Sequence, residues 1–401
     1  MPSCKRIFAA SLLLICLGYG LHILFTPSQP LRFDQQVYIW QRVWTAEHNE
    51  ALKRSRPLFS TLRVLGMQFH PQEGIRHFTV NTSLIKQDGR PVWLVARLEG
   101  QLTRLNNQQI IQHIQQTLRE WQKAGITLVG VEIDYDAPTA KLPDYLTLLS
   151  TLHQALPTNI KLSITVLPTW LESPHLARLL RIADTSVLQV HNVLSPEKGL
   201  LDASLAQRWV KQYARQTTHP FFIALPAYGS ALTSDNRVES EAPLYVAEEM
   251  RELSVSPQTI ADFIQYLEQQ PPHGLQGLVW FRLPLAGDRR AWSLTTLEAV
   301  IQHQPLTPRW SLIITQHADK QLFDLAFKNS GVIDAPLPKQ IIMSNADCLF
   351  ADGASHYQVQ PGPSSLNFVR GSARQLRAGE SSPLGWARCN QKIQGEFNVI
   401  P

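Results

Sequence analysis

Residues 126–136 read Ile-Thr-Leu-Val-Gly-Val-Glu-Ile-Asp-Tyr-Asp, and this stretch decides which fold the chain is predicted to adopt. Successive side chains of a β-strand point to opposite faces. One face carries residues suited to packing beneath helices, namely Thr127, Val129, Val131, Ile133 and Tyr135. The other face carries Leu128, Gly130, Glu132, Asp134 and Asp136. We predict that the three carboxylates converge inside a barrel, where like charge and partial burial raise at least one pKa, as an acid catalyst requires.

This stretch is the fourth of eight apolar runs that alternate with segments of helical periodicity between residue 36 and about residue 304. The predicted strands are residues 36–40, 61–70, 91–99, 126–136, 161–168, 186–192, 221–228 and 275–284. No Gly-rich phosphate turn follows the first strand, although an open doubly wound sheet usually has one. The pattern therefore predicts an α/β fold, a closed (β/α)8 TIM barrel.

Changes in pattern divide the chain into three predicted regions. Residues 1–30 are a membrane anchor or signal peptide, and residues 31–305 form the barrel. In residues 306–401, short alternating runs separated by turn residues replace the helical periodicity, so we predict a small β-sandwich-like accessory domain that packs on the barrel. Residues 229–256 are polar and acidic, which predicts an insertion over the catalytic face.

The N-terminus indicates export. Lys5 and Arg6 precede an uncharged run over residues 7–25, long enough for a helix to span the membrane with its positive flank in the cytoplasm. We expect an uncleaved anchor in the bacterial inner membrane, and a cleaved signal peptide with an apolar core over residues 7–17 is the alternative. Both predict a periplasmic or extracellular protein.

Cysteine content and charge narrow the class of protein. Cys348 and Cys389 are the cysteines of the mature body, so an oxidising compartment predicts one disulfide, with two unpaired thiols as the alternative. The formal net charge is +5, and the basic residues are dispersed, which argues against a nucleic-acid partner. The sequence has no Cys/His metal-ligand spacing, and we expect neither a metal nor another cofactor.

Alternation on the other strands predicts a ligand pocket at their carboxyl ends, where barrel active sites form. The predicted substrate-binding residues are Tyr38, Trp40, Gln68, His70, Arg97, Glu99, Gln189, His191, Tyr228, Trp280 and Arg282. In this assignment Trp280 points inward, whereas Val279 and Phe281 point outward. Aromatic rings suit stacking on sugars, and the arginines suit anionic groups or neutralisation of the acids. Core filling is the alternative for the aromatic residues, and structural hydrogen bonding is the alternative for the histidines.

Several of these motifs together resemble the family 18 chitinases of the TIM-barrel glycoside hydrolase superfamily. Residues 129–136 resemble a degenerate form of that family's signature, D-x-x-D-x-D-x-E, with Asp136 in the place of the catalytic glutamate. Residues 189–192, residues 225–229 and Trp280 resemble its motifs on the sixth, seventh and eighth strands. The string Glu-Ile-Asp-Tyr-Asp-Ala-Pro is also similar to an uncharacterised bacterial family of barrel proteins.

The resemblance implies a glycosidase and leaves two mechanisms open. His191 and Asn192 stand where the family has the tyrosine and aspartate that orient an N-acetyl group. The substrate's acetamido oxygen is the nucleophile in one mechanism. In the other, Asp136 is the acid/base and Glu132, Asp134 or Glu99 supplies the second carboxylate.

We therefore predict an extracytoplasmic glycoside hydrolase-like protein that acts on a polysaccharide or envelope glycan through Asp136, Asp134 and Glu132. The alternative is a non-catalytic carbohydrate- or protein-binding barrel at the cell envelope. A structural ion-pair network or a divalent cation site is the corresponding alternative for the three carboxylates.

Overall fold

A computed structural model describes most of the chain. The described residues are 33–191, 199–232, 238–239, 251–344, 347–362, 365–372, 374–393 and 395–401. The anchor predicted over residues 7–25 lies outside the described residues, as do parts of the insertion predicted over residues 229–256. Within the described ranges, no helix is long and apolar enough to cross a bilayer.

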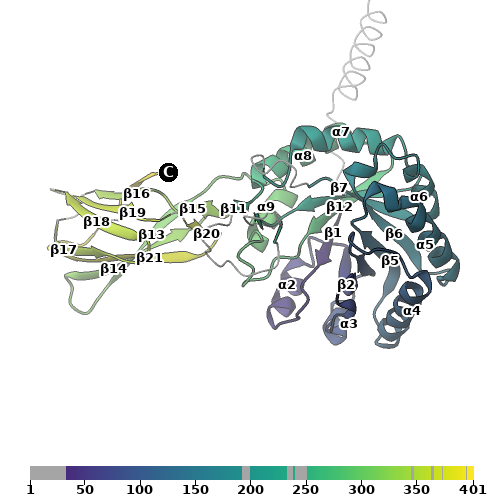
Figure 1. Ribbon diagram of the computed structural model, residues 1–401. Coiled ribbons are helices and arrows are strands. Elements are labelled where there is room, and N and C mark those ends of the chain that lie inside the picture. Colours follow the sequence, from purple (N-terminus) through teal and green to yellow (C-terminus); the bar gives the residue numbers. More distant parts are fainter. Residues whose placement is uncertain are drawn as a thin grey trace, which may run out of the picture.

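Eight parallel strands of the described chain close into a barrel, which confirms the predicted fold (Figure 1). The barrel strands are β1 (Asp34–Ile39), β2 (Thr61–His70), β4 (Val92–Leu98), β5 (Leu128–Tyr135), β6 (Lys161–Val166), β7 (Thr185–Gln189), β8 (Phe221–Pro226) and β12 (Leu275–Phe281). Their order is β1-β12-β8-β7-β6-β5-β4-β2, and pairing of β1 with β2 closes the ring.

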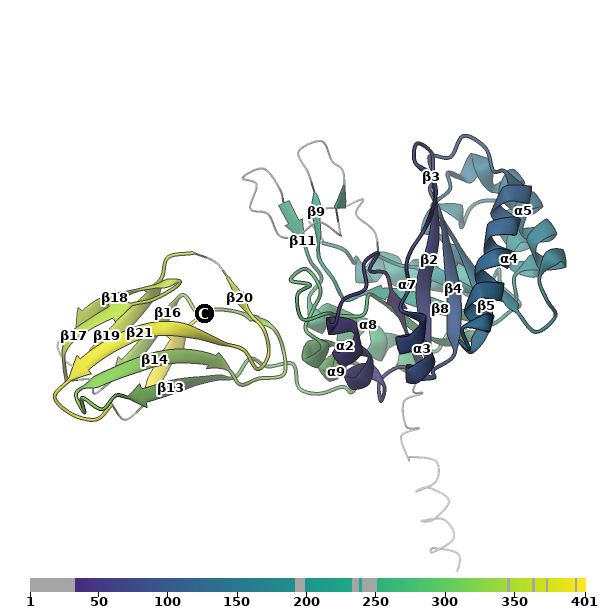
Figure 2. The same ribbon diagram turned by 90° about the horizontal axis from the view of Figure 1, so that it is seen from below.

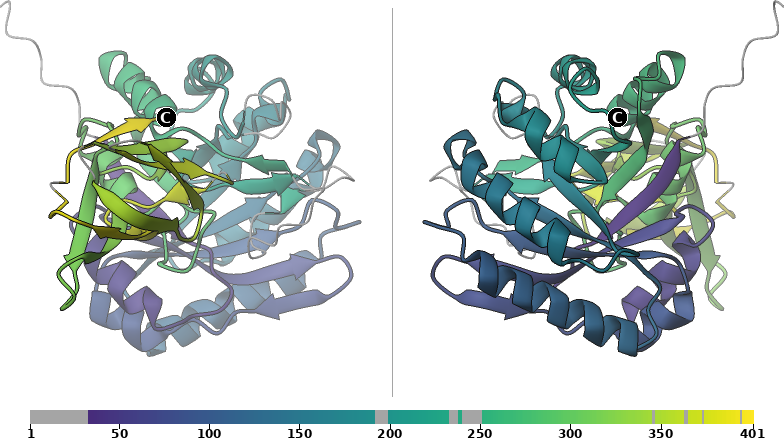
Figure 3. Two further views of the ribbon diagram at one scale, coloured as in Figure 1. Left: turned by 90° about the vertical axis from the view of Figure 1, so that its left-hand side faces the viewer. Right: turned by 90° about the vertical axis from the view of Figure 1, so that its right-hand side faces the viewer.

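Helices cover the outside of the barrel (Figures 1 and 3). They are α2 (Glu47–Ser55), α3 (Thr82–Asp88), α4 (Asn107–Lys123), α5 (Leu142–Ala155), α6 (Leu176–Ile182), α7 (Ala203–Ala214), α8 (Pro257–Gln269) and α9 (Leu294–Ile301). The sequence explains α4 well. The Asn106 side chain caps its first turn by accepting the N–H of Gln109 at 3.2 Å, and its apolar stripe is buried. Gly125, with a φ of +84°, follows its last turn.

Short elements lie near the carboxyl ends of the strands. β3 (Gly74–His77) pairs antiparallel with the end of β2, and the 3-10 turns η1 (Thr139–Lys141) and η2 (Pro168–Trp170) follow β5 and β6. The described parts of residues 229–256 include β9 (Ser230–Leu232), β10 (Val238–Glu239) and β11 (Arg251–Leu253), which form a small antiparallel sheet. These additions surround the end of the barrel that is expected to carry a site.

Two apolar layers stabilise the barrel. The outer layer packs strand residues such as Val131 and Ile133 against the helices. The inner cluster contains Leu65, Val95 and Val279, with further apolar and aromatic side chains from other strands. Burial of each such side chain contributes about 1.5–3 kcal/mol. The barrel interior is therefore a packed core over part of its length, and polar side chains occupy the rest.

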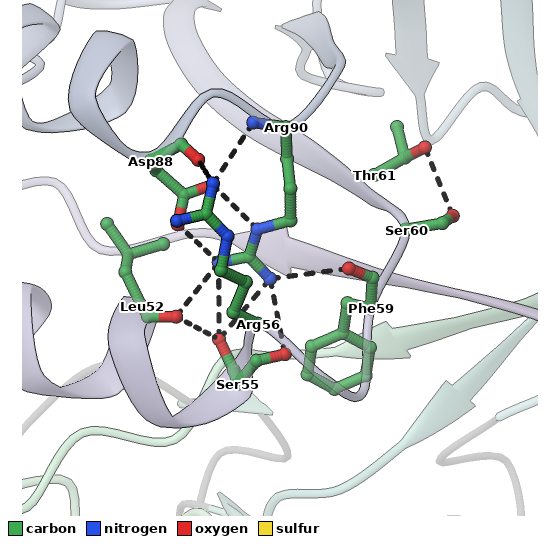
Figure 4. A network of polar contacts seen from close by, with 8 residues as sticks. All are labelled: Leu52, Ser55, Arg56, Phe59, Ser60, Thr61, Asp88 and Arg90. Atoms are coloured by element: carbon green, nitrogen blue, oxygen red, sulfur yellow. Dashed lines mark hydrogen bonds and ion pairs between the residues drawn. The ribbon is translucent and has the colours of Figure 1, made fainter.

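A buried arginine joins elements at the amino ends of the strands (Figure 4). Nε and Nη2 of Arg90 donate to the two carboxylate oxygens of Asp88 at 2.6 and 2.8 Å. Its guanidinium also donates to the carbonyl oxygens of Leu52 at 3.1 Å and Ser55 at 3.3 Å, which end helix α2. The Arg56 guanidinium donates to the Asp88 carbonyl. This cluster holds α2, α3 and the entry to β4 together, away from the carboxyl ends.

The described C-terminal region is a β domain, as predicted. Two four-stranded antiparallel sheets, β13-β14-β21-β17 and β18-β19-β16-β22, share one apolar core. The strands are β13 (Trp310–Gln316), β14 (Leu322–Asn329), β16 (Gln340–Ser344), β17 (Cys348–Gly353), β18 (Tyr357–Gly362), β19 (Ser365–Arg370), β21 (Ser381–Cys389) and β22 (Phe397–Ile400). A disulfide joins Cys348 to Cys389, linking β17 to β21.

The β domain contacts the barrel through the turns beside β15 (Ala335–Pro336) and β20 (Gln375–Leu376), which lie on the side of the β domain that faces the barrel (Figures 1 and 2). Arg377, only 9% exposed, donates to the carbonyl oxygens of Ala286 at 2.9 Å and Ala291 at 3.1 Å, and also to that of Asp288. These carbonyls belong to the loop between β12 and α9. One guanidinium of the β domain therefore fixes a loop of the barrel.

Candidate active site

A cavity of about 420 Å³ opens at the carboxyl ends of the barrel strands. Its lining is polar and aromatic, and consists of Tyr38, Trp40, Arg42, Arg97, Glu99, Asp134, Asp136, Thr165, Gln189, His191, Ala224, Tyr228 and Phe281. The volume is within the range of small-molecule sites, about 300–1,000 Å³. Nine of the residues predicted from the sequence line this cavity, and they come from β1, β4, β5, β7 and β8 or from positions just after them.

Arg97 on β4 is the centre of the polar lining. Its Nε donates to Oε1 of Glu99 at 2.9 Å, its Nη1 to Oδ2 of Asp134 at 2.8 Å, and its Nη2 to Oδ2 of Asp136 at 2.9 Å. The guanidinium carbon also lies 5.6 Å from the ring centroid of Trp40. Among the described residues, one guanidinium thus faces three carboxylates, which leaves an excess of negative charge when all three are ionised.

Asp134 is held on several sides. Its Oδ1 accepts hydrogen bonds from the Thr165 hydroxyl at 2.8 Å and from the Gln189 amide at 3.2 Å, while Oδ2 accepts from Arg97. Only 3% of its side chain is exposed. A carboxylate that accepts three hydrogen bonds is fixed in orientation. Asp134 is therefore an acidic side chain held in one position in the wall of the cavity.

Asp136 is more exposed than Asp134 and has a raised pKa, although both side chains point from the carboxyl end of β5 to the same face. Burial raises the pKa of Asp136 to about 6, and the negative charge of Asp134 acts in the same direction, against the lowering effect of Arg97. The side chain still has 35% of its surface accessible from the cavity. A carboxyl group that is accessible and partly protonated near neutral pH has the properties of a proton donor.

Glu99 and Gln68 complete the polar wall. The Gln68 amide donates to Oε1 of Glu99 at 2.5 Å, and Arg97 donates to the same oxygen. Burial opposes ionisation of Glu99, but Arg97 and these hydrogen bonds leave its pKa below the usual value. Gln68 does not line the cavity itself, so the structure places it behind a residue that does.

Backbone packing fixes the position of the carboxylates. A Cβ atom added to Gly100 would lie 1.9 Å from the carbonyl oxygen of Asp136. On β5, a Cβ atom at Gly130 would lie 2.1 Å from the Trp93 ring. Glycine at these two positions lets the turn after β4 lie against the end of β5, and lets the strand pack on its neighbour. The carboxyl end of β5 is thereby held beside Arg97.

Aromatic rings gather around Phe281 at the end of β12. Its ring centroid lies 5.1 Å from that of Trp40, 5.0 Å from that of Tyr228 and 5.9 Å from that of Tyr38. The His191 ring stacks on it at 6.2 Å. Burial lowers the pKa of His191 to about 4, so the imidazole is neutral at neutral pH. These rings give the cavity an apolar wall opposite its acidic one.

Glu132, predicted to be catalytic, does not line the cavity. It is fully buried beneath it, forms an ion pair with Arg63, and accepts hydrogen bonds from the Tyr38 hydroxyl at 2.7 Å and the Ser163 hydroxyl at 2.8 Å. The parity of β5 was predicted correctly, but Glu132 lies deeper in the barrel than Asp134 and Asp136. The structure therefore brings two of the three predicted carboxylates to the cavity.

The inward orientation predicted for Trp280 is wrong. Its ring belongs to the outer apolar layer, 6.4 Å from the Trp292 ring, and its Nε1 donates to Oε1 of Gln35 at 2.7 Å. Val279 and Phe281 point into the barrel instead. Both sets of side chains on β12 are largely apolar, so alternation alone could not decide the face.

Two more predicted residues lie away from the cavity lining. Arg282 follows the end of β12 and pairs with Asp288 at 2.7 Å. His70 ends β2, and its Nδ1 accepts the backbone N–H groups of Gln72 and Glu73, both at 3.2 Å. His70 thus forms structural hydrogen bonds, as its alternative proposes. Arg282 pairs with an aspartate of the loop after β12, which neither interpretation of this arginine predicted.

Four lining residues were missed from the sequence. Thr165 lies on β6, two positions beyond Ser163, so the same alternation test applied to that strand would have found it. Phe281 follows from the correct parity of β12. Ala224 carries no polar signal, and Arg42 lies in the loop after β1, where no strand pattern applies. Among the described residues, no group of three or more His, Cys, Asp or Glu side chains is arranged to hold a metal ion.

Comparison with known families gives two matches, both to families without assigned activity. Residues 88–286 match the model of a domain of unknown function (DUF3142), which covers most of the barrel. Residues 312–390 match another domain of unknown function (DUF8456) in the β domain. No curated protein matches the chain.

Solved structures resemble the fold. The spore cortex-lytic enzyme SleL of Bacillus cereus matches with a TM-score of 0.51 and 11% identity, over 70% of this chain and 76% of that one. SleL of Bacillus megaterium QM B1551 matches with a TM-score of 0.51 and 12% identity, over 71% and 76%. A chitinase from Bacteroides thetaiotaomicron matches less well, with a TM-score of 0.49 and 14% identity over 63% and 90%. The barrel therefore shares its fold with the two SleL structures.

Proposed function

We propose that this protein is a glycoside hydrolase that cleaves a polysaccharide or an envelope glycan. The main support is Asp136, an accessible carboxyl group whose pKa is raised to about 6, in a cavity that a second aspartate, Asp134, also lines. Glycoside hydrolysis needs an acid to protonate the leaving oxygen, together with negative charge for the oxocarbenium-like transition state.

The roles follow from the surroundings of each side chain. Asp136 donates a proton to the glycosidic oxygen as the bond of that oxygen to the anomeric carbon breaks. A water molecule then forms the new bond to the anomeric carbon and returns a proton to Asp136. Asp134, fixed by Thr165, Gln189 and Arg97, stabilises positive charge at the sugar ring. Because neutral His191 and the rings of Trp40, Tyr228 and Phe281 form the opposite wall, a sugar ring can stack there while its hydroxyl groups meet the acidic wall.

The raised pKa gives the proposal a pH signature. An acid catalyst must be protonated, and the protonated fraction of Asp136 falls as the pH rises through about 6. The value of kcat/KM, which reports the free enzyme, should therefore decrease tenfold per pH unit above about pH 7. A flat rate between pH 5 and 9 would contradict the acid role.

Hydrolysis by the full chain is the direct test. Polysaccharides with and without N-acetyl groups, including chitin oligosaccharides, chitosan, peptidoglycan and β-glucans, would be incubated with the protein and assayed for new reducing ends. We expect Asp136→Asn to lower the rate by about 10²–10⁴-fold, and Asp134→Asn to lower it similarly. Asp262→Asn, an exposed aspartate on α8, is the matched control. Equal rates for Asp136→Asn and the wild type would refute the assignment.

One observation favours a second function, a barrel that binds glycans without cleaving them. Arg97 donates a hydrogen bond to Asp136 as well as to Asp134, and such a bond favours the ionised form of Asp136. Saturable binding of a glycan that yields no new reducing ends, lost in Tyr228→Ala, would establish this function instead.

Export to the periplasm or beyond is also part of the proposal, and its support is the sequence of residues 1–30. Protease accessibility of the protein in intact spheroplasts would test it, because an extracytoplasmic chain is digested and a cytoplasmic one is protected.

A further inference from the structure

The outer face of the sheet β13-β14-β21-β17 carries a row of polar and aromatic side chains. The strand registers place Thr315 opposite Asp324, Asp324 opposite Trp386, and Trp386 opposite Asp352. The neighbours in sequence, such as Phe323 and Ala387, point into the core of the β domain, so the row itself faces outward. A tryptophan thus lies between two aspartates, one strand spacing away on each side.

These side chains are accessible. Trp386 is 40% exposed, and the Asp324 side chain is 60% exposed. Phe350, two positions before Asp352 on the edge strand β17, is 66% exposed and lies diagonally from Trp386 on the same face. Single exposed apolar residues are common, but two adjacent aromatic rings with charged neighbours on one sheet face indicate a binding surface.

The polar neighbours can accept hydrogen bonds from a ligand. Asp324 accepts from His317 at 2.8 Å, and Asp352 accepts the N–H of Gly353 at 2.8 Å. A carboxylate has about four acceptor positions, so each aspartate can take further donors. Arg388, in the next row of β21 beside Phe350, adds a donor at the edge of the face and pairs with Asp319 at 2.7 Å.

We propose that this face is a glycan-binding surface for an uncharged polysaccharide chain. One sugar ring stacks on the Trp386 indole, and its hydroxyl groups donate to Asp324 and Asp352 on either side. Directly opposite residues are about 4.5–5.5 Å apart and diagonal ones about 7–8 Å, so the Phe350 ring is within reach of the next sugar. The flanking carboxylates disfavour anionic polymers. This binding does not depend on hydrolysis in the barrel.

A second copy of the chain fits the face less well. Stacking Trp386 on its copy about a two-fold axis would bring two pairs of aspartates together, and like charges opposite each other are destabilising. A polysaccharide provides hydroxyl donors at the same places.

Calorimetric titration of the full chain with cellohexaose and with chitohexaose tests the surface. We expect Trp386→Ala to weaken binding about tenfold or more, and Asp324→Ala/Asp352→Ala to weaken it further. Ile400→Ala, which removes an exposed apolar side chain from the opposite sheet, should leave the affinity unchanged. Trp40→Ala in the barrel cavity separates the two sites, because it should not reduce binding at the sheet.

Three outcomes would overturn the proposal. In the first outcome, the wild type binds neither oligosaccharide. In the second, Trp386→Ala binds both oligosaccharides as tightly as the wild type, and Trp40→Ala alone loses binding. In the third, sedimentation shows that the wild type dimerises and Trp386→Ala does not, which would make the face a self-association surface. Turnover without binding at the sheet, or binding at the sheet without turnover, distinguishes this proposal from the proposed hydrolase function.

Discussion

Two arginine–carboxylate clusters lie one above the other inside the barrel, and they differ in their charge balance. In the lower cluster, Arg63 pairs with Glu132 and both side chains are fully buried. The rings of Trp93 and Phe222 lie 5.1 and 5.3 Å from the Arg63 guanidinium carbon. In the upper cluster, Arg97 is 22% exposed, contacts three carboxylates and borders the cavity.

The difference separates the structural role of the lower cluster from the chemical role that we propose for the upper one. In the lower cluster, one guanidinium faces one carboxylate, so the two charges balance each other. In the upper cluster, burial raises the pKa of Asp136 to about 6, and the negative charge of Asp134 adds to this rise against the lowering effect of Arg97. Burial and acidity alone do not mark the site, since Glu132 is the more buried of the two.

The largest expected effect is in the lower cluster. Arg63→Met leaves Glu132 buried without its cation, and should lower the free energy of unfolding by about 3–5 kcal/mol in urea denaturation. The double variant Arg63→Met/Glu132→Leu removes both charges and should regain most of the loss. A loss below about 1 kcal/mol for the single variant would show that the pair is not structural.

The cluster at the opposite end from the cavity should behave like the lower one. Arg90→Met removes both bonds to Asp88 and the donors to the end of α2, and we expect a loss of about 3 kcal/mol. Arg56→Met, which loses a contact to the Asp88 carbonyl only, is the control and should cost about 1 kcal/mol. Equal losses of unfolding free energy in the two variants would mean that the additional contacts of Arg90 do not stabilise the fold.

Tyr38 connects the two clusters, because it lines the cavity and donates to Glu132 at 2.7 Å. Tyr38→Phe keeps the ring and removes the donor to a buried carboxylate, so the unfolding free energy should fall by about 2 kcal/mol. Glycan binding in the cavity should change less than twofold. A large loss of glycan binding with unchanged stability would mean that the Tyr38 hydroxyl acts on the ligand, like the upper cluster, and not on Glu132.

The smallest expected effect is a gain of stability in the upper cluster. In the folded protein the pKa of Asp136 is above its ordinary value of 3.8. The stabilising contribution of this carboxyl group to the free energy of unfolding is therefore full below pH 3.8 and is lost as the pH rises through about 6. Asp136→Asn does not titrate. After allowance for solvent exposure of the carboxylate, we expect the variant to be about 1 kcal/mol more stable at pH 7.5.

Unfolding at several pH values would measure this gain, with Asp262→Asn as the control. The advantage of Asp136→Asn should disappear between pH 6 and pH 4. An advantage that is independent of pH would mean that the pKa of Asp136 is not raised.

Alternation predicted the barrel and much of its acidic wall, because on β5 one face is apolar and the other carries all the carboxylates. It failed on β12, where Trp280 and Phe281 are both apolar enough for either face. Arg282, whose polarity suggested the wrong parity, follows the end of that strand. Local patterns do not determine a face when both faces of the strand are packed.

The pattern of β5 alone could not predict that Glu132 forms a buried ion pair while Asp134 and Asp136 line the cavity. Arg63, the partner of Glu132, lies 69 positions away in a strand that is buried along nearly its whole length. A register shift between Leu65 and Met67 also reverses the alternation on β2, so Arg63 and Gln68 both face the interior. The charge balance of each acid depends on such long-range pairs, which require the fold.

The Arg377 guanidinium of the β domain binds a loop of the barrel, so the two domains cannot be separated without a change in the barrel. A chain cut after Pro305 would expose the β12–α9 loop and deprive the carbonyls of Ala286 and Asp288 of their donor. The same loop pairs Ala291 with Tyr228 in the cavity wall. The β domain is therefore not an interchangeable module, because its removal would alter the barrel's cavity as well as its surface.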